Sequence, residues 1–162
     1  MTDESWPEPV ARVSRALREA GAEARIEEFA TGTPTAEDAA RAVGCELRRI
    51  VKSLLFECDG RPVLVLVPGD RRADPQKIAA LTGAARARVA GPAAVEDATG
   101  YAAGAVAPFP LRRVERVLIE RSLLAGGVLW VGAGSTRHMA GLPAAELVRV
   151  ARAQPVDVVA DV

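Results

Sequence analysis

The chain has 162 residues and a mass of 17.0 kDa, and its 21 Lys and Arg residues balance 21 Asp and Glu residues. This length favours one domain over residues 1–162. Zero net charge excludes a global field that would draw the protein onto nucleic acid or a membrane, so any RNA binding would need a local basic patch.

Helix and strand signals alternate along the chain, and Gly and Pro separate them. Several predicted strands are hairpin neighbours, which indicates an α/β fold with a mixed, mostly antiparallel, barrel-like sheet flanked by helices. In chain order we expect a helix over 7–20, a strand over 25–29, a helix over 35–44, strands over 48–56 and 62–67, a helix over 74–83, a strand over 86–89, a helix over 92–98, strands over 114–120 and 127–131, a helix over 143–151, and a strand or tail over 156–159.

One predicted strand carries an unusual lysine. The stretch Arg48 to Phe56 is typical of a buried strand, and alternation places Lys52 on the same face as three large apolar residues. An ammonium group there is costly unless an anionic group meets it or its aliphatic stem reaches water. Only Lys52 and Lys77 among the cationic residues are lysines. Lys52 is therefore either a strand residue that reaches solvent or the cation of a site.

Two glycine-containing segments are candidates for backbone that binds a ligand. Gly104 to Pro108 is either a plain connection or a loop that aims consecutive N–H groups at a developing oxyanion. Gly132 to Gly134 is either a tight strand exit or backbone that a ligand approaches closely. The second segment lacks the glycine that completes a dinucleotide fingerprint, and the chain has no P-loop, so no nucleotide cofactor is expected.

The usual acid–base groups of enzymes are scarce. His138 is the single histidine, and neither a Ser-His-Asp set nor a group of metal ligands at known spacings is present, so we predict no metal and no cofactor. Cys45 and Cys58, together with the absence of an apolar secretory segment or a transmembrane run, favour a cytoplasmic protein with reduced thiols and no membrane partner. Any catalysis would depend on positioning and electrostatics.

Arginine pairs lie beside the stretches singled out above. Most such pairs are solvated surface, yet several phosphate contacts from one rim would give salt-sensitive binding of nucleic acid despite the neutral chain. The pairs are Arg48-Arg49, Arg71-Arg72 and Arg112-Arg113, with Arg137 near the second glycine segment.

The sequence resembles the YbaK/prolyl-tRNA-synthetase-associated editing-domain family, over about residues 11–151, so a core of about 10–152 is expected. Each motif that carries the resemblance is short, but their order and spacing together are specific. They are T-A-E-D-A-A (35–40), I-V-K-S-L-L-F (50–56), L-V-L-V-P-G-D (64–70), T-G-Y-A-A-G-A-V-A-P (99–108) and G-A-G (132–134).

The resemblance implies a family lysine at Lys52 that engages the tRNA acceptor end, and a G-x-x-x-P loop from Gly104 to Pro108 that faces the scissile carbonyl. Three departures bear on substrate choice: Ala105 replaces a frequent Gly, Phe29 lacks the hydroxyl of a Tyr in some members, and Glu120 replaces a frequent Asp. The implied catalytic residues are Lys52, Gly104 and Ala105, and the implied substrate contacts are Phe29, Thr35, Ser53, Thr99, Gly100, Val106, Pro108, Gly134 and Ser135.

The resemblance implies a trans-acting aminoacyl-tRNA deacylase, for instance of the Cys-tRNA(Pro) or Ala-tRNA(Pro) type, whose partners are the tRNA acceptor end and an aminoacyl-tRNA synthetase. A second hydrolytic sieve is useful because a methylene group is worth only about 1–3 kcal/mol in a synthetase pocket. Two alternatives stay open at this point: a catalytically inactive module that binds tRNA or a synthetase, and an esterase of small molecules.

Overall fold

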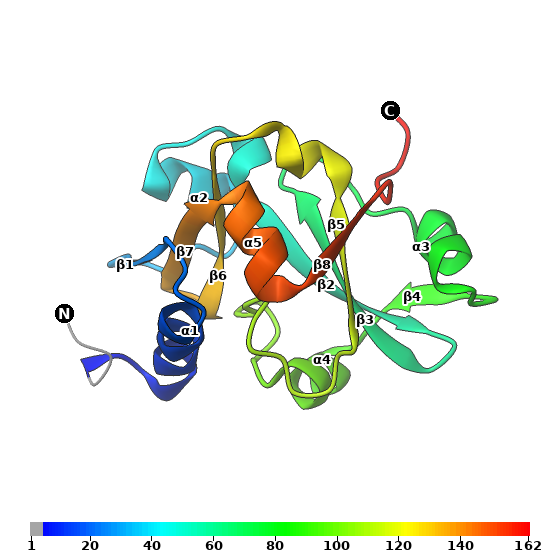
Figure 1. Cartoon of the computed structure of the whole chain (residues 1–162), viewed down its shortest axis with the longest axis horizontal. Coiled ribbons are helices and arrows are strands. Elements are labelled where there is room, and N and C mark those ends of the chain that lie inside the picture. The colour runs from blue at the N-terminus through cyan, green and yellow to red at the C-terminus, as the bar shows by residue number, and fades with distance from the viewer. Residues whose placement is uncertain (1–4) are drawn as a thin grey trace.

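The computed structural model describes residues 5–162, and residues 1–4 lie outside the described part. Helices and strands alternate along it as the sequence indicates (Figure 1). The helices are α1 (Glu8–Glu19), α2 (Ala36–Val43), α3 (Pro75–Thr82), α4 (Pro92–Thr99) and α5 (Ala144–Ala151), with short 3-10 turns η2 (Leu47–Arg49) and η3 (Arg121–Ala125). The strands are β1 (Arg25–Glu28), β2 (Val51–Cys58), β3 (Arg61–Pro68), β4 (Ala87–Val89), β5 (Arg116–Glu120), β6 (Val128–Ser135), β7 (His138–Pro143) and β8 (Ala153–Val156).

A five-stranded sheet in the order β4-β2-β3-β5-β8 holds the long central hairpin. The β2–β3 turn consists of Asp59 and Gly60, both with positive φ (51° and 82°), as the Asp-Gly pair predicts. Strand β2 is antiparallel to β3 and β4, whereas β3, β5 and β8 run parallel to one another. The mixed sheet, mostly antiparallel across the whole molecule, is therefore confirmed.

A second sheet of three strands, in the order β1-β7-β6, lies beside the first (Figure 1). Both of its pairings are antiparallel. A parallel bridge between Ile50 and Trp130 joins the start of β2 to β6. The expectation of a single barrel-like sheet needs this correction: within residues 5–162 the strands form two sheets, and neither closes into a barrel.

Strand β7 is absent from the sequence prediction. Its residues His138–Pro143 include Ala, Gly and Pro, which have low strand propensity, so the sequence pattern does not reveal it. The structure explains one of these choices, since a Cβ on Gly141 would lie 2.8 Å from the ring of Trp130 on β6. The final strand is also displaced from the prediction: β8 begins at Ala153, directly after α5, and ends at Val156.

The two faces of β2 belong to different apolar clusters, as the alternation predicts. Val51 and Leu55 are buried in the main core under α1, α4 and α5. Leu54 and Phe56 pack into a second cluster with Ile78 of α3. Lys52 lies on this second face, at the end of the strand where the cluster gives way to the loop after β3. The sheet thus fixes the position of the lysine stem.

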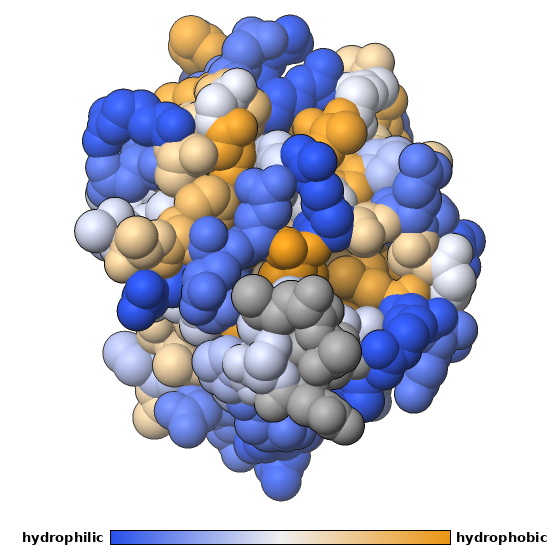
Figure 2. All heavy atoms as spheres, turned by 90° about the vertical axis from the view of Figure 1, so that its left-hand side faces the viewer, coloured by the Kyte–Doolittle hydropathy of each residue, from blue (hydrophilic) through white to orange (hydrophobic). Residues whose placement is uncertain are grey.

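None of the helices within residues 5–162 is both long and apolar enough to cross a membrane. Figure 2 shows the face that carries α1, β1 and β7, where apolar side chains are interspersed with hydrophilic ones.

Candidate functional site

A pocket of about 310 Å³ opens at the start of β2 and holds the side chain of Lys52. Its walls come from the loop before α2, from β2, from the 101–110 loop and from the β6–β7 hairpin. Lys52 is the one charged residue in the lining, and the others are small or apolar. The lining residues are Thr33, Pro34, Thr35, Ala36, Ala39, Ile50, Val51, Lys52, Ser53, Leu54, Gly104, Val106, Gly132 and Met139.

The ammonium group of Lys52 is half-buried and donates a hydrogen bond to the main-chain carbonyl of Arg71. Within residues 5–162 it has no carboxylate partner at ion-pair distance. Burial, and then the nearby guanidinium of Arg72, lower the pKa of Lys52, while Glu37 and Asp70 act in the opposite direction. A cation without a bound carboxylate is available to an anionic or strongly polar substrate group.

The loop after α4 supplies the second wall through Gly104 and Val106. Gly104 has φ +87°, a conformation that non-glycine residues rarely adopt. The amide of Ala105 donates to the carbonyl of Ala102 at 2.9 Å, so it is already used within the loop. The amides of Gly104 and Val106 make no hydrogen bond to another described residue, so these two donors are unused within the loop.

The third wall is formed by Gly132 on β6 and not by Gly134. A Cβ on Gly132 would lie 2.4 Å from the carbonyl oxygen of Val106, so only glycine permits this approach of the strand to the loop. Gly134 faces the start of α1 instead, where a Cβ would lie 2.8 Å from the backbone of Pro9. Both glycines of the 132–134 segment thus serve close backbone contacts, but Gly132 is the one at the pocket.

Two hydroxyl residues predicted as substrate contacts line the pocket, and they differ in whether their hydroxyl groups already have hydrogen-bond partners. Thr35 is the N-cap of α2, and its hydroxyl accepts from the amide of Asp38 at 3.1 Å and donates to the Asp38 carboxylate at 2.9 Å. The hydroxyl of Ser53 is buried and has no hydrogen-bond partner in the described part of the chain. A buried hydroxyl without a partner is rare, so Ser53 holds an unused hydrogen-bonding group directly behind the surface of the pocket.

The remaining predicted contacts lie outside the pocket lining. Thr99 is buried and bonds the Val95 carbonyl at 2.7 Å, and Gly100 ends α4 with φ +85°, so both hold the start of the 101–110 loop. Phe29 packs against the apolar cluster behind the pocket, which includes the lining residues Ile50 and Met139. Ala105 and Pro108 are buried in the loop.

Ser135 and His138 interact with each other across the β6–β7 turn. The Ser135 Oγ lies 2.6 Å from Nδ1 of His138 and accepts the amide of Arg137 at 3.0 Å. The second ring nitrogen of His138 lies 3.3 Å from a carboxylate oxygen of Glu28. Burial lowers the pKa of His138, against a smaller raising effect of Glu28. This polar cluster holds the hairpin to β1 and lies outside the lining of the Lys52 pocket.

Nine of the pocket residues were not predicted as contacts, and Gly132 and Met139 are among them. Gly132 belongs to the Gly132–Gly134 segment that the sequence singles out, so membership of that segment is the sequence signal that points to it. Met139 lies on β7, the strand that the sequence pattern does not reveal. Within the described residues, no group of His, Cys, Asp and Glu side chains could hold a metal ion.

Comparison with known proteins identifies relatives of this chain. A family model described as an aminoacyl-tRNA editing domain matches residues 30–150. The protein YwhH of Bacillus subtilis is 34% identical over 123 residues, which are 75% of this chain and 78% of YwhH. The proline--tRNA ligase of Maridesulfovibrio salexigens is 38% identical over 100 residues, which are 61% of this chain; the chain thus spans only 17% of the ligase.

Solved structures agree with this assignment. A proposed trans-editing enzyme for prolyl tRNA synthetase superimposes with a TM-score of 0.90 at 32% identity, over 97% of this chain and 100% of that one. A hypothetical protein, APE2540, superimposes with a TM-score of 0.86 at 27% identity, over 92% of this chain and 99% of that one. The chain belongs to the family of aminoacyl-tRNA editing domains.

Proposed function

We propose that the protein is a trans-acting deacylase that hydrolyses the ester bond of a mischarged aminoacyl-tRNA. The observation that carries this proposal is the pocket in which a single ammonium group, of Lys52, faces a wall of glycine-containing backbone, at Gly104 and Gly132. The family membership and the likeness to a proposed trans-editing enzyme support the same reaction class.

The chemistry needs no acid–base residue from the protein. Lys52 anchors the acceptor end, and the amides of Gly104 and Val106 stabilise the oxyanion that forms when water attacks the ester carbonyl. The ester C–O bond then breaks, and the ribose oxygen leaves with a proton that comes from the attacking water. The products are the free amino acid and uncharged tRNA.

The small pocket favours a small amino acid. Apart from Lys52 and Met139, its lining is built from Gly, Ala, Pro, Ser, Thr and branched aliphatic side chains. Its volume of about 310 Å³ must also admit part of the terminal ribose. The matched proline--tRNA ligases point to tRNA(Pro) as the carrier. We therefore propose Ala-tRNA(Pro) or Cys-tRNA(Pro) as the substrate.

The alternative of an inactive binding module had two motives, the methyl group at Ala105 and the zero net charge of the chain. Ala105 is buried in its loop and does not line the pocket, so it does not support that alternative, whereas the net charge still does.

The test is a panel of tRNA(Pro) molecules charged with labelled Ala, Cys, Ser or Pro. We expect amino acid to be released from one of the small mischarged species at a rate well above that in buffer, and Pro-tRNA(Pro) to stay intact. Retention of RNA in a gel without release of any amino acid would support the binding module instead, and turnover of simple esters without tRNA would support a small-molecule esterase.

A further inference from the structure

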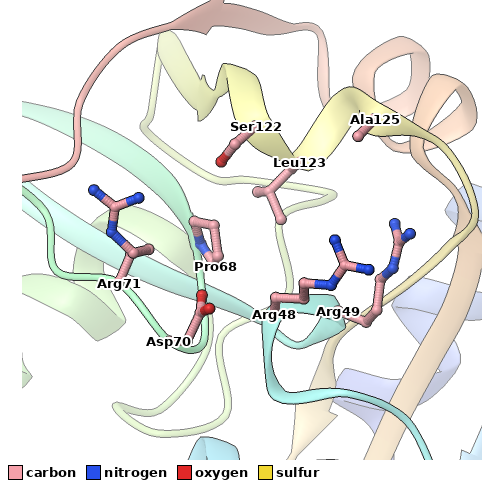
Figure 3. Close-up of a pocket in the computed structure, with 8 residues that line it drawn as sticks. All are labelled: Arg48, Arg49, Pro68, Asp70, Arg71, Ser122, Leu123 and Ala125. Atoms are coloured by element: carbon pink, nitrogen blue, oxygen red, sulfur yellow. The ribbon is translucent and has the colours of Figure 1, made fainter.

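A second cavity, of about 170 Å³, lies beside the Lys52 pocket and is lined by three arginines (Figure 3). It brings together members of two arginine pairs that are far apart in the sequence, Arg48-Arg49 and Arg71-Arg72. Neither arginine of the third pair, Arg112-Arg113, lines this cavity. The lining residues are Arg48, Arg49, Pro68, Asp70, Arg71, Ser122, Leu123 and Ala125.

Each guanidinium group in this cavity is held by a partner at its edge. Arg49 donates to the carbonyl of Gly126, and Arg71 donates to the carbonyl of Ala160 at 2.8 Å. Arg48 binds the carboxylate of Glu46 at 3.0 and 3.3 Å. A guanidinium group has five N–H donors, so these contacts orient the side chains and leave further donors for a ligand. The fork geometry suits phosphate oxygens.

The segment after β3 separates this cavity from the Lys52 pocket. The side chain of Arg71 lines the arginine cavity, while its carbonyl accepts the hydrogen bond from Lys52 on the other side. The segment is packed tightly against its neighbours: the amide of Gly69 donates to the Ile50 carbonyl at 2.7 Å, and a Cβ on Gly69 would lie 2.6 Å from the Leu47 carbonyl oxygen. The two sites are therefore fixed relative to each other.

We propose that the arginine cavity binds a backbone phosphate of the single-stranded RNA 3′ end, upstream of the terminal nucleotide whose aminoacyl group occupies the Lys52 pocket. This proposal rests on the proposed function, since the RNA reaches both sites only if its end enters the pocket. A phosphodiester is the matching ligand because it is anionic, narrow and rich in acceptor oxygens, and successive phosphates of one strand suit neighbouring sites.

Asp70 sets the strength of this site. Its carboxylate lines the cavity between Arg48 and Arg71, and within residues 5–162 it forms no ion pair or hydrogen bond (Figure 3). A free carboxylate beside a phosphate is repulsive. Removal of its charge therefore strengthens the binding of RNA, which is the opposite of the effect of removing an arginine.

The experiment measures the binding of an uncharged RNA oligonucleotide that ends in CCA, at several salt concentrations, so it requires no turnover. We expect Arg48→Ala and Arg71→Ala each to weaken binding about tenfold and to reduce the salt dependence by about one phosphate contact. Asp70→Asn tightens binding. Arg113→Ala is the matched control, because Arg113 is an exposed arginine paired with Asp97 at the far end of β3 and β5.

A neutral methylphosphonate, placed at each linkage in turn, identifies the phosphate. At one linkage, the methylphosphonate should weaken the binding of RNA to the native protein. With that modified RNA, Arg48→Ala should cause no further loss of binding. Equal losses for Arg48→Ala and Arg113→Ala, or no linkage that couples to Arg48, would overturn the proposal. Binding of inorganic phosphate that depends on Arg48, with RNA binding unaffected, would also overturn it. If one linkage couples to Arg48 but the protein releases no amino acid from any charged tRNA, the phosphate site stands and the proposed deacylase activity is refuted.

Discussion

The ammonium group of Lys52 donates its hydrogen bond to the carbonyl of Arg71, a residue nineteen positions later in the chain. A carbonyl orients the amine without neutralising it, whereas a carboxylate would do both. Strand β2 fixes the lysine stem, and the loop after β3 fixes the acceptor. The positive charge is thus held at the edge of the pocket and stays available for the substrate.

The first prediction concerns Lys52 itself. We expect Lys52→Ala to lower the deacylation rate by about 100-fold or more, as the loss of a preorganised electrostatic group does, and to leave the fold intact, since Lys52 is only half-buried. Lys52→Arg should not restore the rate, because a planar guanidinium differs from a compact ammonium in reach and hydration. Circular dichroism and release of labelled amino acid measure both effects. Wild-type rates in Lys52→Ala would refute the role of this lysine.

The second prediction concerns the pH dependence of the rate. Burial and Arg72 lower the pKa of Lys52 below its ordinary value of 10.5, so the ammonium is lost, and the rate falls, at a lower pH than for a free lysine. Arg72→Gln removes the like charge and should move this alkaline limb to higher pH. The move should restore only part of the lowering of the Lys52 pKa, because burial is the larger cause and remains. Arg72→Lys keeps the charge and should leave the limb in place.

The measurement is the enzymatic rate between about pH 7 and pH 10, after subtraction of the spontaneous hydrolysis of the ester in buffer. A limb that moves equally in Arg72→Gln and Arg72→Lys would show that charge is not the cause.

The limits of the sequence prediction follow from what each residue does. The face of Lys52 follows from strand alternation, and the Asp59-Gly60 turn follows from its φ requirements. By contrast, Gly132 and Gly134 look equivalent in the sequence, and only their tertiary neighbours, Val106 and Pro9, distinguish them. The same holds for β7, where Gly141 is required by the ring of Trp130 and not by any local preference.

The arginine cavity shows the same limit. Arg48-Arg49 and Arg71-Arg72 are visible as pairs, but the position of Arg48, Arg49 and Arg71 around one cavity depends on the antiparallel register of β2 and β3, which pairs Val51 with Pro68. The accessible sequence signals gave no reason to separate them from Arg112-Arg113.

The third prediction concerns Gly132. A methyl group there would lie 2.4 Å from the Val106 carbonyl oxygen, and because that oxygen belongs to the main chain, the loop must move. We expect Gly132→Ala to cost about 1–3 kcal/mol of folding free energy and to lower deacylation more than its stability loss explains. Gly91→Ala is the control, because a Cβ there meets no atom within 4 Å and the residue has an ordinary φ. Thermal unfolding and kcat/KM report the two effects separately.

The fourth prediction concerns Glu120, whose buried carboxylate accepts the amides of Ser122 at 2.9 Å and Val158 at 3.0 Å. Burial alone would raise its pKa, but these backbone hydrogen bonds outweigh burial and leave the pKa below 4.5. Its contribution to stability is therefore present above pH 4.5 and is lost as the pH falls through the lowered value.

Glu120→Gln replaces one of the two acceptor oxygens with an amide nitrogen, which cannot accept. We expect a loss of about 1–3 kcal/mol near neutral pH and a flatter stability curve below pH 4.5 than in the native protein. The Val158 contact anchors the segment that meets Arg71 and Arg72 through Ala160, so deacylation should also fall. Urea unfolding between about pH 3 and pH 7 tests the prediction. A parallel offset of the two curves across that range would show that the carboxylate charge contributes nothing.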